Sequence, residues 1–383
     1  MPDGTPHRLP RGPEGHTLPP LARKGRGAGL NPPVRFERTA REAFDDGWGT
    51  LEAAFAELPP LPTTLTPDRS KSALAWNESP DIGFDRAVNP YRGCEHGCVY
   101  CYARPSHAWL GLSPGLDFET RLIFKPDIAA LLEKELRRPG YVPRPIALGS
   151  NTDPYQPVER TLRLTRAVLE LLDRFEHPVT IVTKSAGVLR DLDLLSALAR
   201  RNLVRVCLSV TTLDARLARI MEPRAASPER RLAALRHLSE AGIPTAVLAA
   251  PMIPGVNDAE LEAILERAAA AGASGAGYVL LRLPLEIREI FEDWLARHMP
   301  ERAARVLSLI RQTRGGALYD SRFGLRQRGS GAYADLLAQR FAVAARRLGL
   351  ERRGAGVAGL DCTRFRVPEA AAKPPAADQL SLF

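Results

Sequence analysis

Cysteine and long apolar runs are what this sequence lacks most clearly: a chain of 383 residues holds five cysteines. Five cysteines in a chain of this size do not indicate the dense framework of a small disulfide-bonded domain. No apolar run reaches the roughly 18 residues of a membrane span. Residues 1–41 also lack the apolar core of a secretory signal, so we expect a cytoplasmic protein without a membrane partner.

Acidic residues are outnumbered, which gives a formal net charge of +9 and a pI near 9.6. Such a balance favours an acidic partner, and nucleic acid is the obvious candidate. The stretch Arg311–Arg353 holds ten arginines and no lysine against three acidic residues. We expect this stretch to contact phosphates, although an Ala-, Arg-, Gly- and Pro-rich composition would also produce it without any ligand.

The distribution of proline and glycine divides the chain. Residues 1–75 are predicted to be a basic, partly disordered extension with one helix near Arg38–Leu58, because Pro-Pro pairs interrupt it. Residues 76–300 are predicted to form the core, and residues 301–365 a basic helical C-terminal extension. Residues 366–383 are rich in Ala and Pro and are predicted to be a flexible tail.

Short apolar runs alternate with helical patterns through the core. The predicted strands are Ile146–Leu148, Val179–Val182, Val204–Val210, Thr245–Ala249 and Tyr278–Leu281, with a further strand before Tyr91. Helices are expected at 127–137, at 164–175, after the N-cap Ser227 and from Asn257 to near Gly272. Fully apolar strands alternating with helices predict an α/β fold with a parallel sheet, and six such units predict a partial or closed (β/α)6 TIM-type barrel.

Polar residues follow the predicted strands at the ends where barrel active sites lie. This set consists of Ser150, Asn151, Asp153, Lys184, Ser185, Ser209, Thr211, Thr212 and Arg282. A barrel that only packs needs no such residues, so we expect a ligand at this mouth.

Three of the five cysteines, Cys94, Cys98 and Cys101, form a C-x3-C-x2-C motif. Three thiolates on one loop hold three irons of a [4Fe–4S] cluster and leave the fourth iron open to a small molecule. The alternatives are a zinc site, or cysteines that are redox-active or merely buried. Zinc would need a fourth ligand, for which His96, His107, Cys207 and Cys362 are available, and this spacing is unusual for zinc.

The motif, with Tyr100 just before the third cysteine, resembles the signature of the radical S-adenosylmethionine (radical SAM) superfamily. The strings NPYRGCEHGCVYCYARPSH, SPGLDFETRLIFKPD, LGSNTDPYQPVE, TKS, SVTT and MEPRAASPERRL extend the resemblance, over roughly residues 80–345, to a bacterial group in the spore photoproduct lyase-like branch. The resemblance implies a radical SAM-type partial barrel with N- and C-terminal extensions. It also implies that the open iron binds S-adenosylmethionine, which is cleaved to a 5′-deoxyadenosyl radical, and that an electron donor such as flavodoxin or ferredoxin reduces the cluster.

The resemblance also implies roles for single residues. Tyr100 is expected to contact adenine, and Lys184 and Ser209 the carboxylate and ribose of S-adenosylmethionine. Lys184 could instead be a solvated surface charge, and Ser209 a strand-end hydrogen bond to backbone. Glu222 and Arg224 could orient a ligand or pair with each other. The predicted cofactor-binding set is Tyr100, Ser150, Asn151, Asp153, Lys184, Ser209 and Thr211.

One position departs from the family pattern. Spore photoproduct lyase has a hydrogen-donating cysteine at the end of its second strand, where this chain has Ser150. Because a hydroxyl is a poor hydrogen-atom donor, reversal of a thymine lesion by the same route is not expected. Tyr100, Tyr102 and Tyr155 remain candidates for a radical relay, and the catalytic residues stay unassigned.

The last five residues place apolar side chains after a polar linker. Gln379, Leu380, Leu382 and Phe383 resemble the peptide by which bacterial repair and replication proteins dock on the DNA polymerase sliding clamp. We expect this segment to order on binding, unless it folds back on its own barrel.

Three functional interpretations follow from these features. The first is a radical SAM enzyme acting in DNA repair or on another nucleic acid. The second keeps the same chemistry for a peptide, tRNA or small molecule, and the third is a zinc-stabilised, DNA-associated scaffold without catalysis. The sequence contains no second cysteine cluster of this kind.

Overall fold

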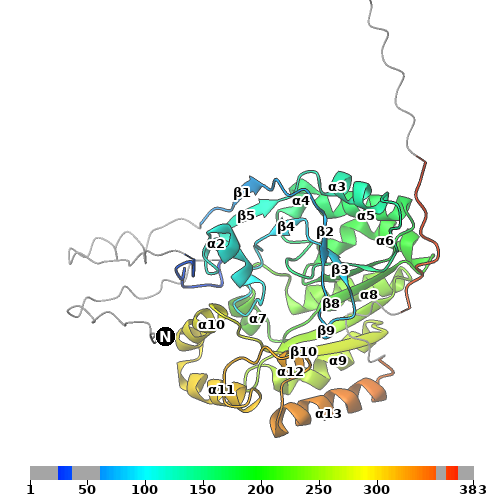
Figure 1. Ribbon diagram of the computed structural model, residues 1–383. Coiled ribbons are helices and arrows are strands. Elements are labelled where there is room, and N and C mark those ends of the chain that lie inside the picture. The colour runs from blue at the N-terminus through cyan, green and yellow to red at the C-terminus, as the bar shows by residue number, and fades with distance from the viewer. Residues whose placement is uncertain (1–24, 37–60, 351–358, 370–383) are drawn as a thin grey trace, which may run out of the picture.

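The computed structural model describes residues 25–36, 61–350 and 359–369 and contains one large, mainly parallel sheet (Figure 1). Its strand order is β10-β9-β8-β7-β6-β3-β2. Six neighbouring strands run parallel, and β2 joins the edge antiparallel to β3. The strands are β2 (Leu74–Trp76), β3 (Arg86–Val88), β6 (Ile146–Leu148), β7 (Val179–Thr183), β8 (Val204–Ser209), β9 (Thr245–Met252) and β10 (Gly275–Leu280). The predicted six-unit partial barrel is confirmed, with differences only at some strand ends.

Helices cover the outer face of this sheet (Figure 1). They are α3 (Ile128–Leu136), α5 (Leu164–Arg174), α6 (Leu192–Ala199), α8 (Pro228–Glu240) and α9 (Leu261–Ala270). Their apolar stripes and the strands form one buried core, since parallel strands have both faces covered. Helix α13 (Ala332–Arg347) packs on α9 as a further layer.

A second core lies beside the mouth of the barrel. Helices α7 (Ala215–Met221), α10 (Ile287–His298) and α11 (Pro300–Gln312) pack there against residues 98–100. A small sheet of β1 (Thr64–Pro67), β5 (Arg121–Phe124) and β4 (Tyr91–Arg92) flanks the same loop. Further short elements are η1 (Arg104–Leu110), α2 (Asp117–Thr120), α4 (Glu159–Leu162), η2 (Ala186–Asp191) and η3 (Asp258–Glu260). The sequence predicted neither the small sheet nor the second core.

Two predictions concern the residues at which helices begin, Ser227 and Asn257. The Ser227 hydroxyl accepts a hydrogen bond from the Arg230 N–H, so it caps α8 as predicted. The helix predicted to start at Asn257 starts there as η3, with Asn257 in the N-cap position, and continues as α9 from Leu261, but the Asn257 side chain makes no capping hydrogen bond. The Asn257 side chain instead accepts from the Ile253 N–H and donates to the carbonyl oxygens of Thr211 and Pro251.

The loop between β2 and β3 reaches the opposite edge of the sheet. The Gly324 N–H donates to Asp81 over 2.6 Å, and Arg326 pairs with the same carboxylate. Arg326 belongs to α12 (Leu325–Arg328), which contacts β10. These contacts bridge the open side of the partial barrel.

The predicted helix near Arg38–Leu58 and the C-terminal peptide at 379–383 lie outside the described residues. The described part of residues 301–365 contains α11 from its second residue onward, α12 and α13. Among the described helices, none has the length and apolar character needed to cross a membrane.

Candidate active site

The three cysteines lie on the loop between β4 and η1. Gly93 and Gly97 adopt positive φ angles of 82° and 68°, which turn the backbone at low cost in a residue without Cβ. The loop is held by backbone hydrogen bonds from the Cys94 N–H to Phe118 O and from the Cys101 N–H to Cys98 O. Cys94 and Cys98 are buried, and Cys101 is partly exposed.

The surroundings of the Cys94 and Cys98 thiols disfavour the ionised thiolate form when no metal is bound. Burial is the main cause that raises both pKa values, and the neighbouring cysteines raise them further. Lys184 acts in the opposite direction on Cys98. A metal centre supplies the missing positive charge and binds thiolates, so the loop fits a metal cluster.

No three His, Cys, Asp or Glu side chains in the described ranges are grouped so that they could hold one metal ion. A cubane cluster takes one thiolate at each of three separate iron corners, so its ligands need not meet at one point. Two of the four candidate zinc ligands are engaged elsewhere: His96 lies 3.3 Å from Asp153, and His107 Nε2 lies 2.9 Å from Arg121 O.

A buried ion pair braces the cysteine loop from one side. Arg104 and Glu119 are fully buried and lie 2.5 Å apart. Arg104 also donates to Cys98 O over 2.9 Å, and Glu119 accepts from the N–H groups of Gly27 and Ala28 at 2.9 Å each. Residues 25–36 therefore pack against this loop.

The residues after β6 hold the loop from the other side. Gln156 is fully buried; its side chain accepts from the Glu95 N–H over 2.8 Å and donates to Gly93 O over 3.2 Å. Glu95 accepts from the Val158 N–H over 2.9 Å. These bonds tie the cysteine loop to the end of the second parallel strand.

Asp153 joins the cysteine loop to two strand ends. Its carboxylate accepts from the Thr183 hydroxyl and the Lys184 N–H, both at 2.7 Å, and faces His96. Burial alone would raise its pKa, but His96 and the hydrogen bonds outweigh burial and lower the pKa to about 2. Asp153 thus has its oxygens bound by protein groups and positions the residues around it.

A buried polar cluster lies around Tyr100. The Glu222 carboxylate accepts from the hydroxyls of Tyr100 and Thr211 and pairs with Arg231. Lys184 Nζ lies 5.7 Å from the centre of the Tyr100 ring. The structure therefore brings three predicted cofactor residues together and adds Glu222 and Arg231.

Glu222 and Arg224 do not pair with each other, so that alternative was wrong. Glu222 pairs with Arg231, and Arg224 pairs with Glu95 at 3.1 Å. The pattern MEPRAASPERR marks this segment, but it does not reveal which arginine reaches the carboxylate.

The other predicted cofactor residues lie at neighbouring strand ends. Ser150 and Asn151 both contact the Asn89 side chain, through the Ser150 hydroxyl and the Asn151 N–H. Ser209 is buried at the end of β8, and its carbonyl accepts from Arg231 over 3.0 Å. Asn89 lies in the string that carries the resemblance, and its role here was missed.

Tyr102 and Arg282 face each other across the mouth. The Arg282 guanidinium lies 4.5 Å from the ring centre of Tyr102, and the Tyr102 hydroxyl donates to Ser150 O. Tyr100 and Tyr155 are buried, whereas Tyr102 is 48% exposed, so Tyr102 is the candidate relay that a substrate can reach.

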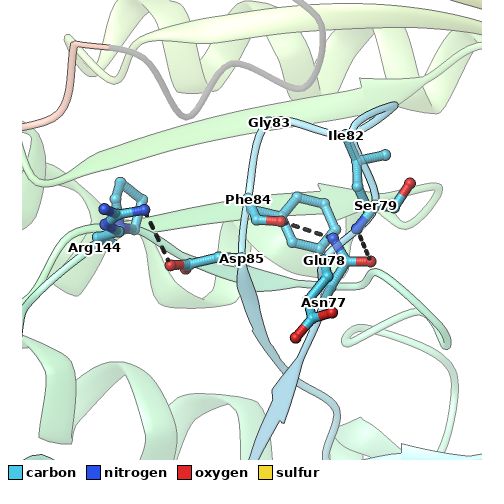
Figure 2. Close-up of a pocket in the computed structure, with 9 residues that line it drawn as sticks. Asn77, Glu78, Ser79, Ile82, Gly83, Phe84, Asp85 and Arg144 are labelled. Carbon is cyan, nitrogen blue, oxygen red and sulfur yellow. Dashed lines mark hydrogen bonds and ion pairs between the residues drawn. The ribbon is translucent and has the colours of Figure 1, made fainter. Parts of the chain in front are cut away.

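Two hollows in the protein differ in whether they adjoin the cysteine loop. One, of about 610 Å³, is lined by His96, Glu222 and residues that follow β6, β7 and α7. The other, of about 380 Å³, lies in the β2–β3 connection, where Arg144 pairs with Asp85 and Asn77 bonds to Phe84 O (Figure 2). The first adjoins the cysteine loop and the second does not.

Comparisons with known proteins agree with this geometry. Residues 88–268 match the family model of the radical SAM superfamily. An uncharacterised protein of Mycobacterium tuberculosis is 39% identical over 247 residues, which cover 63% of this chain and 72% of that protein. An uncharacterised protein of Methanocaldococcus jannaschii is 30% identical over 178 residues, covering 46% and 64%.

Solved structures of spore photoproduct lyase share the fold. A variant with one cysteine replaced by serine superimposes with a TM-score of 0.53 at 19% identity, covering 75% of this chain and 80% of that one. A doubly substituted variant with bound S-adenosylmethionine and dinucleoside spore photoproduct gives 0.53 at 17% identity, covering 77% and 86%. The chain belongs to the radical SAM superfamily of enzymes, whose cofactors are a [4Fe–4S] cluster and S-adenosylmethionine.

Proposed function

We propose that Cys94, Cys98 and Cys101 hold the cluster and that the enzyme acts on a nucleic acid, in DNA repair. The observation that carries the cofactor assignment is the position of the cysteine loop over the strand ends, with Lys184 beside Tyr100. When bound, the two cofactors supply one-electron chemistry that ends in abstraction of a hydrogen atom from a substrate.

The chain's own residues hold S-adenosylmethionine in this proposal. The Lys184 ammonium binds its carboxylate as a compact cation. Tyr100 faces the adenine, with its hydroxyl fixed by Glu222, while Ser209 and Thr211 lie at the end of β8 on the ribose side. Ser150 holds Asn89 and donates no hydrogen atom to the product, so the route differs from one that uses a cysteine thiol.

The nucleic-acid substrate has two supports. The shared fold with spore photoproduct lyase, solved with a dinucleoside photoproduct, makes a nucleic-acid lesion the first substrate class to test. The net charge of +9 agrees with a polyanionic substrate. The electron donor in this proposal is a flavodoxin or ferredoxin.

The test is anaerobic cleavage of S-adenosylmethionine by the reconstituted enzyme, screened against damaged DNA, RNA and peptides. Stimulation by one nucleic-acid class is the expected result, and stimulation by peptides alone would refute the substrate assignment. The Cys98→Ala variant should lose the iron and sulfide that the parent enzyme binds. If that variant keeps full iron and sulfide, or if the colourless parent binds one zinc, the cluster assignment is wrong.

We further propose that the C-terminal peptide, with Leu382 and Phe383 as anchors, recruits the enzyme to a bacterial sliding clamp in the cytoplasm. This proposal is supported by the sequence Gln-Leu-Ser-Leu-Phe at 379–383. Calorimetric titration of the full chain into a purified clamp should show binding that Phe383→Ala weakens at least about tenfold, as expected for an interface anchor. If the parent chain and the Phe383→Ala variant give the same heat of binding, the enzyme does not dock on the clamp through this peptide.

A further inference from the structure

Part of the arginine-rich stretch Arg311–Arg353 is already engaged by the protein itself. Four of its eight described arginines form ion pairs with carboxylates of the protein, and Arg314 donates to the carbonyl oxygens of Leu280, Leu281 and Leu325. The ion pairs are Arg322–Asp320, Arg326–Asp81, Arg340–Glu262 and Arg347–Glu266. Half of its ten arginines are thus held by protein groups. Arg340 and Arg347 join α13 to α9, and Arg326 joins α12 to the β2–β3 loop.

Several arginines also line a single hollow of about 610 Å³ beside the cysteine loop. Four arginines line it: Arg160, Arg219, Arg224 and Arg230. We call this hollow the arginine cavity. Arg224 pairs with Glu95, whereas the other three form no ion pair with any described residue.

The acidic side chain in the lining does not neutralise these arginines. Glu222 is 2% exposed and is already bound by Arg231, Tyr100 and Thr211. The nearby Asp214 carboxylate caps α7 by accepting from two backbone N–H groups. Within the described ranges, the guanidinium groups of Arg160, Arg219 and Arg230 therefore line the cavity without a carboxylate paired to them.

The helix and loops that line the arginine cavity also favour the binding of an anion. Helix α8 has 13 residues, and its cap Ser227 and first-turn Arg230 both line the cavity. The positive end of the α8 dipole thus adds to the field of the arginines. The cavity also reaches His96, which lies between two of the cysteines, and Ser185, which follows β7.

The volume of the arginine cavity and the chemistry of its guanidinium groups together indicate the kind of ligand that it binds. A hollow of about 610 Å³ is large for one inorganic ion and suits a nucleotide-sized group. Guanidinium groups bind phosphate oxygens in a planar, bidentate geometry. We infer that the arginine cavity, and not the stretch 311–353, binds the phosphates of a nucleic-acid strand. This inference rests on the proposed nucleic-acid function.

The test compares two double variants of the reconstituted holoenzyme. Arg219→Gln/Arg230→Gln removes two charges from the cavity, and Arg311→Gln/Arg346→Gln removes two exposed charges from the arginine-rich stretch. Each is titrated anaerobically, by fluorescence anisotropy, into the same labelled single-stranded and duplex oligonucleotides at several salt concentrations. The cavity variant should bind about tenfold or more weakly, and its log–log salt slope should shrink by about 1.4 to 1.8, because two phosphate contacts are lost. The control should stay within about twofold of the parent. Similar losses in both variants, or a loss only in the control, would overturn the inference.

Further measurements separate failure of this inference from failure of the proposed function. If the parent binds no oligonucleotide, the nucleic-acid function fails. A nucleoside monophosphate could then still protect the parent, but not the cavity variant, against thermal unfolding. That result would show that the cavity binds a free nucleotide, and it would overturn the inference that it binds a nucleic-acid strand. If no phosphate compound protects the parent, no phosphate site is present. If the cavity variant binds oligonucleotides normally but is reduced more slowly by an acidic electron-transfer protein, the cavity is a protein-docking surface and the inference is wrong.

Discussion

Replacement of Arg104 by methionine tests whether a buried ion pair braces the cysteine loop. Arg104 and Glu119 are both 0% exposed. The substitution leaves the Glu119 carboxylate buried with only the backbone donors of Gly27 and Ala28. It also removes the donor to Cys98 O and those to Pro114 O and Gly115 O.

The size of the effect follows from this count of lost partners. Breaking one side of a buried pair costs about 3–5 kcal/mol. Three carbonyl oxygens also lose donors, so we expect the free energy of unfolding to fall by at least about 4 kcal/mol. The matched control is Arg288→Met, whose i,i+4 pair with Glu292 is 59% and 33% exposed and is worth about 0.5 kcal/mol or less.

Urea unfolding followed by circular dichroism measures both variants. A cost for Arg104→Met within about 1 kcal/mol of the control would refute the reasoning, because a paired charge in a dry site cannot be lost so cheaply. The double variant Arg104→Met/Glu119→Gln should recover at least about 1 kcal/mol relative to Arg104→Met, since no buried charge then remains unpaired. Simple additivity of the two single substitutions would show that the residues are not coupled.

Three further predictions concern the cofactor, the N-terminal segment and pH. Lys184→Ala should weaken S-adenosylmethionine binding about 10- to 100-fold in equilibrium dialysis, because one charge-assisted contact is lost; unchanged affinity would place the carboxylate elsewhere. In Gly27→Ala the new Cβ would lie 1.8 Å from Gly97 O, so the free energy of unfolding should fall by about 1–3 kcal/mol. Gly187→Ala should lower it less, because its new Cβ would approach only the Ser185 hydroxyl, at 3.0 Å. Burial lowers the pKa of His177 to about 4, and its Nε2 accepts from Tyr141 while Nδ1–H donates to Pro178 O, as in the neutral ring. Stability from His177 is therefore complete above about pH 6.5 and falls by up to about 3 kcal/mol as pH drops to 4; His177→Gln should flatten this slope in unfolding measured across pH.

Local patterns predicted the strands and the mouth of the barrel well. An apolar run such as Val179–Thr183 specifies a strand buried on both faces, and polar residues such as Asp153 and Lys184 mark where strands end. Arg104 and Glu119 could not be predicted as core residues, because each charge is tolerated there only through the other. The contact of Gly27 with Gly97 likewise depends on two segments that share no local pattern.

The arginines between Arg311 and Arg353 show the same limit of prediction from sequence. The sequence shows how many arginines lie between Arg311 and Arg353, but not that Arg340 and Arg347 meet Glu262 and Glu266. Those partners are 78 and 81 residues away and belong to a different helix. Net charge along the chain is therefore a poor guide to where a fold leaves charge free, and the arginine cavity is visible only in three dimensions.

The order of the strands has a consequence for how the protein is assembled. Every strand of the large sheet pairs with the strand that precedes it in that sheet along the chain, so the sheet can grow one strand at a time during synthesis. The contacts of Asp81 and Ser79 with residues 324–326 span 243 to 247 residues, and closing so long a loop carries the larger entropy cost. The open side of the barrel is therefore the last part to close, and its mouth stays accessible from that side until the C-terminal helices arrive.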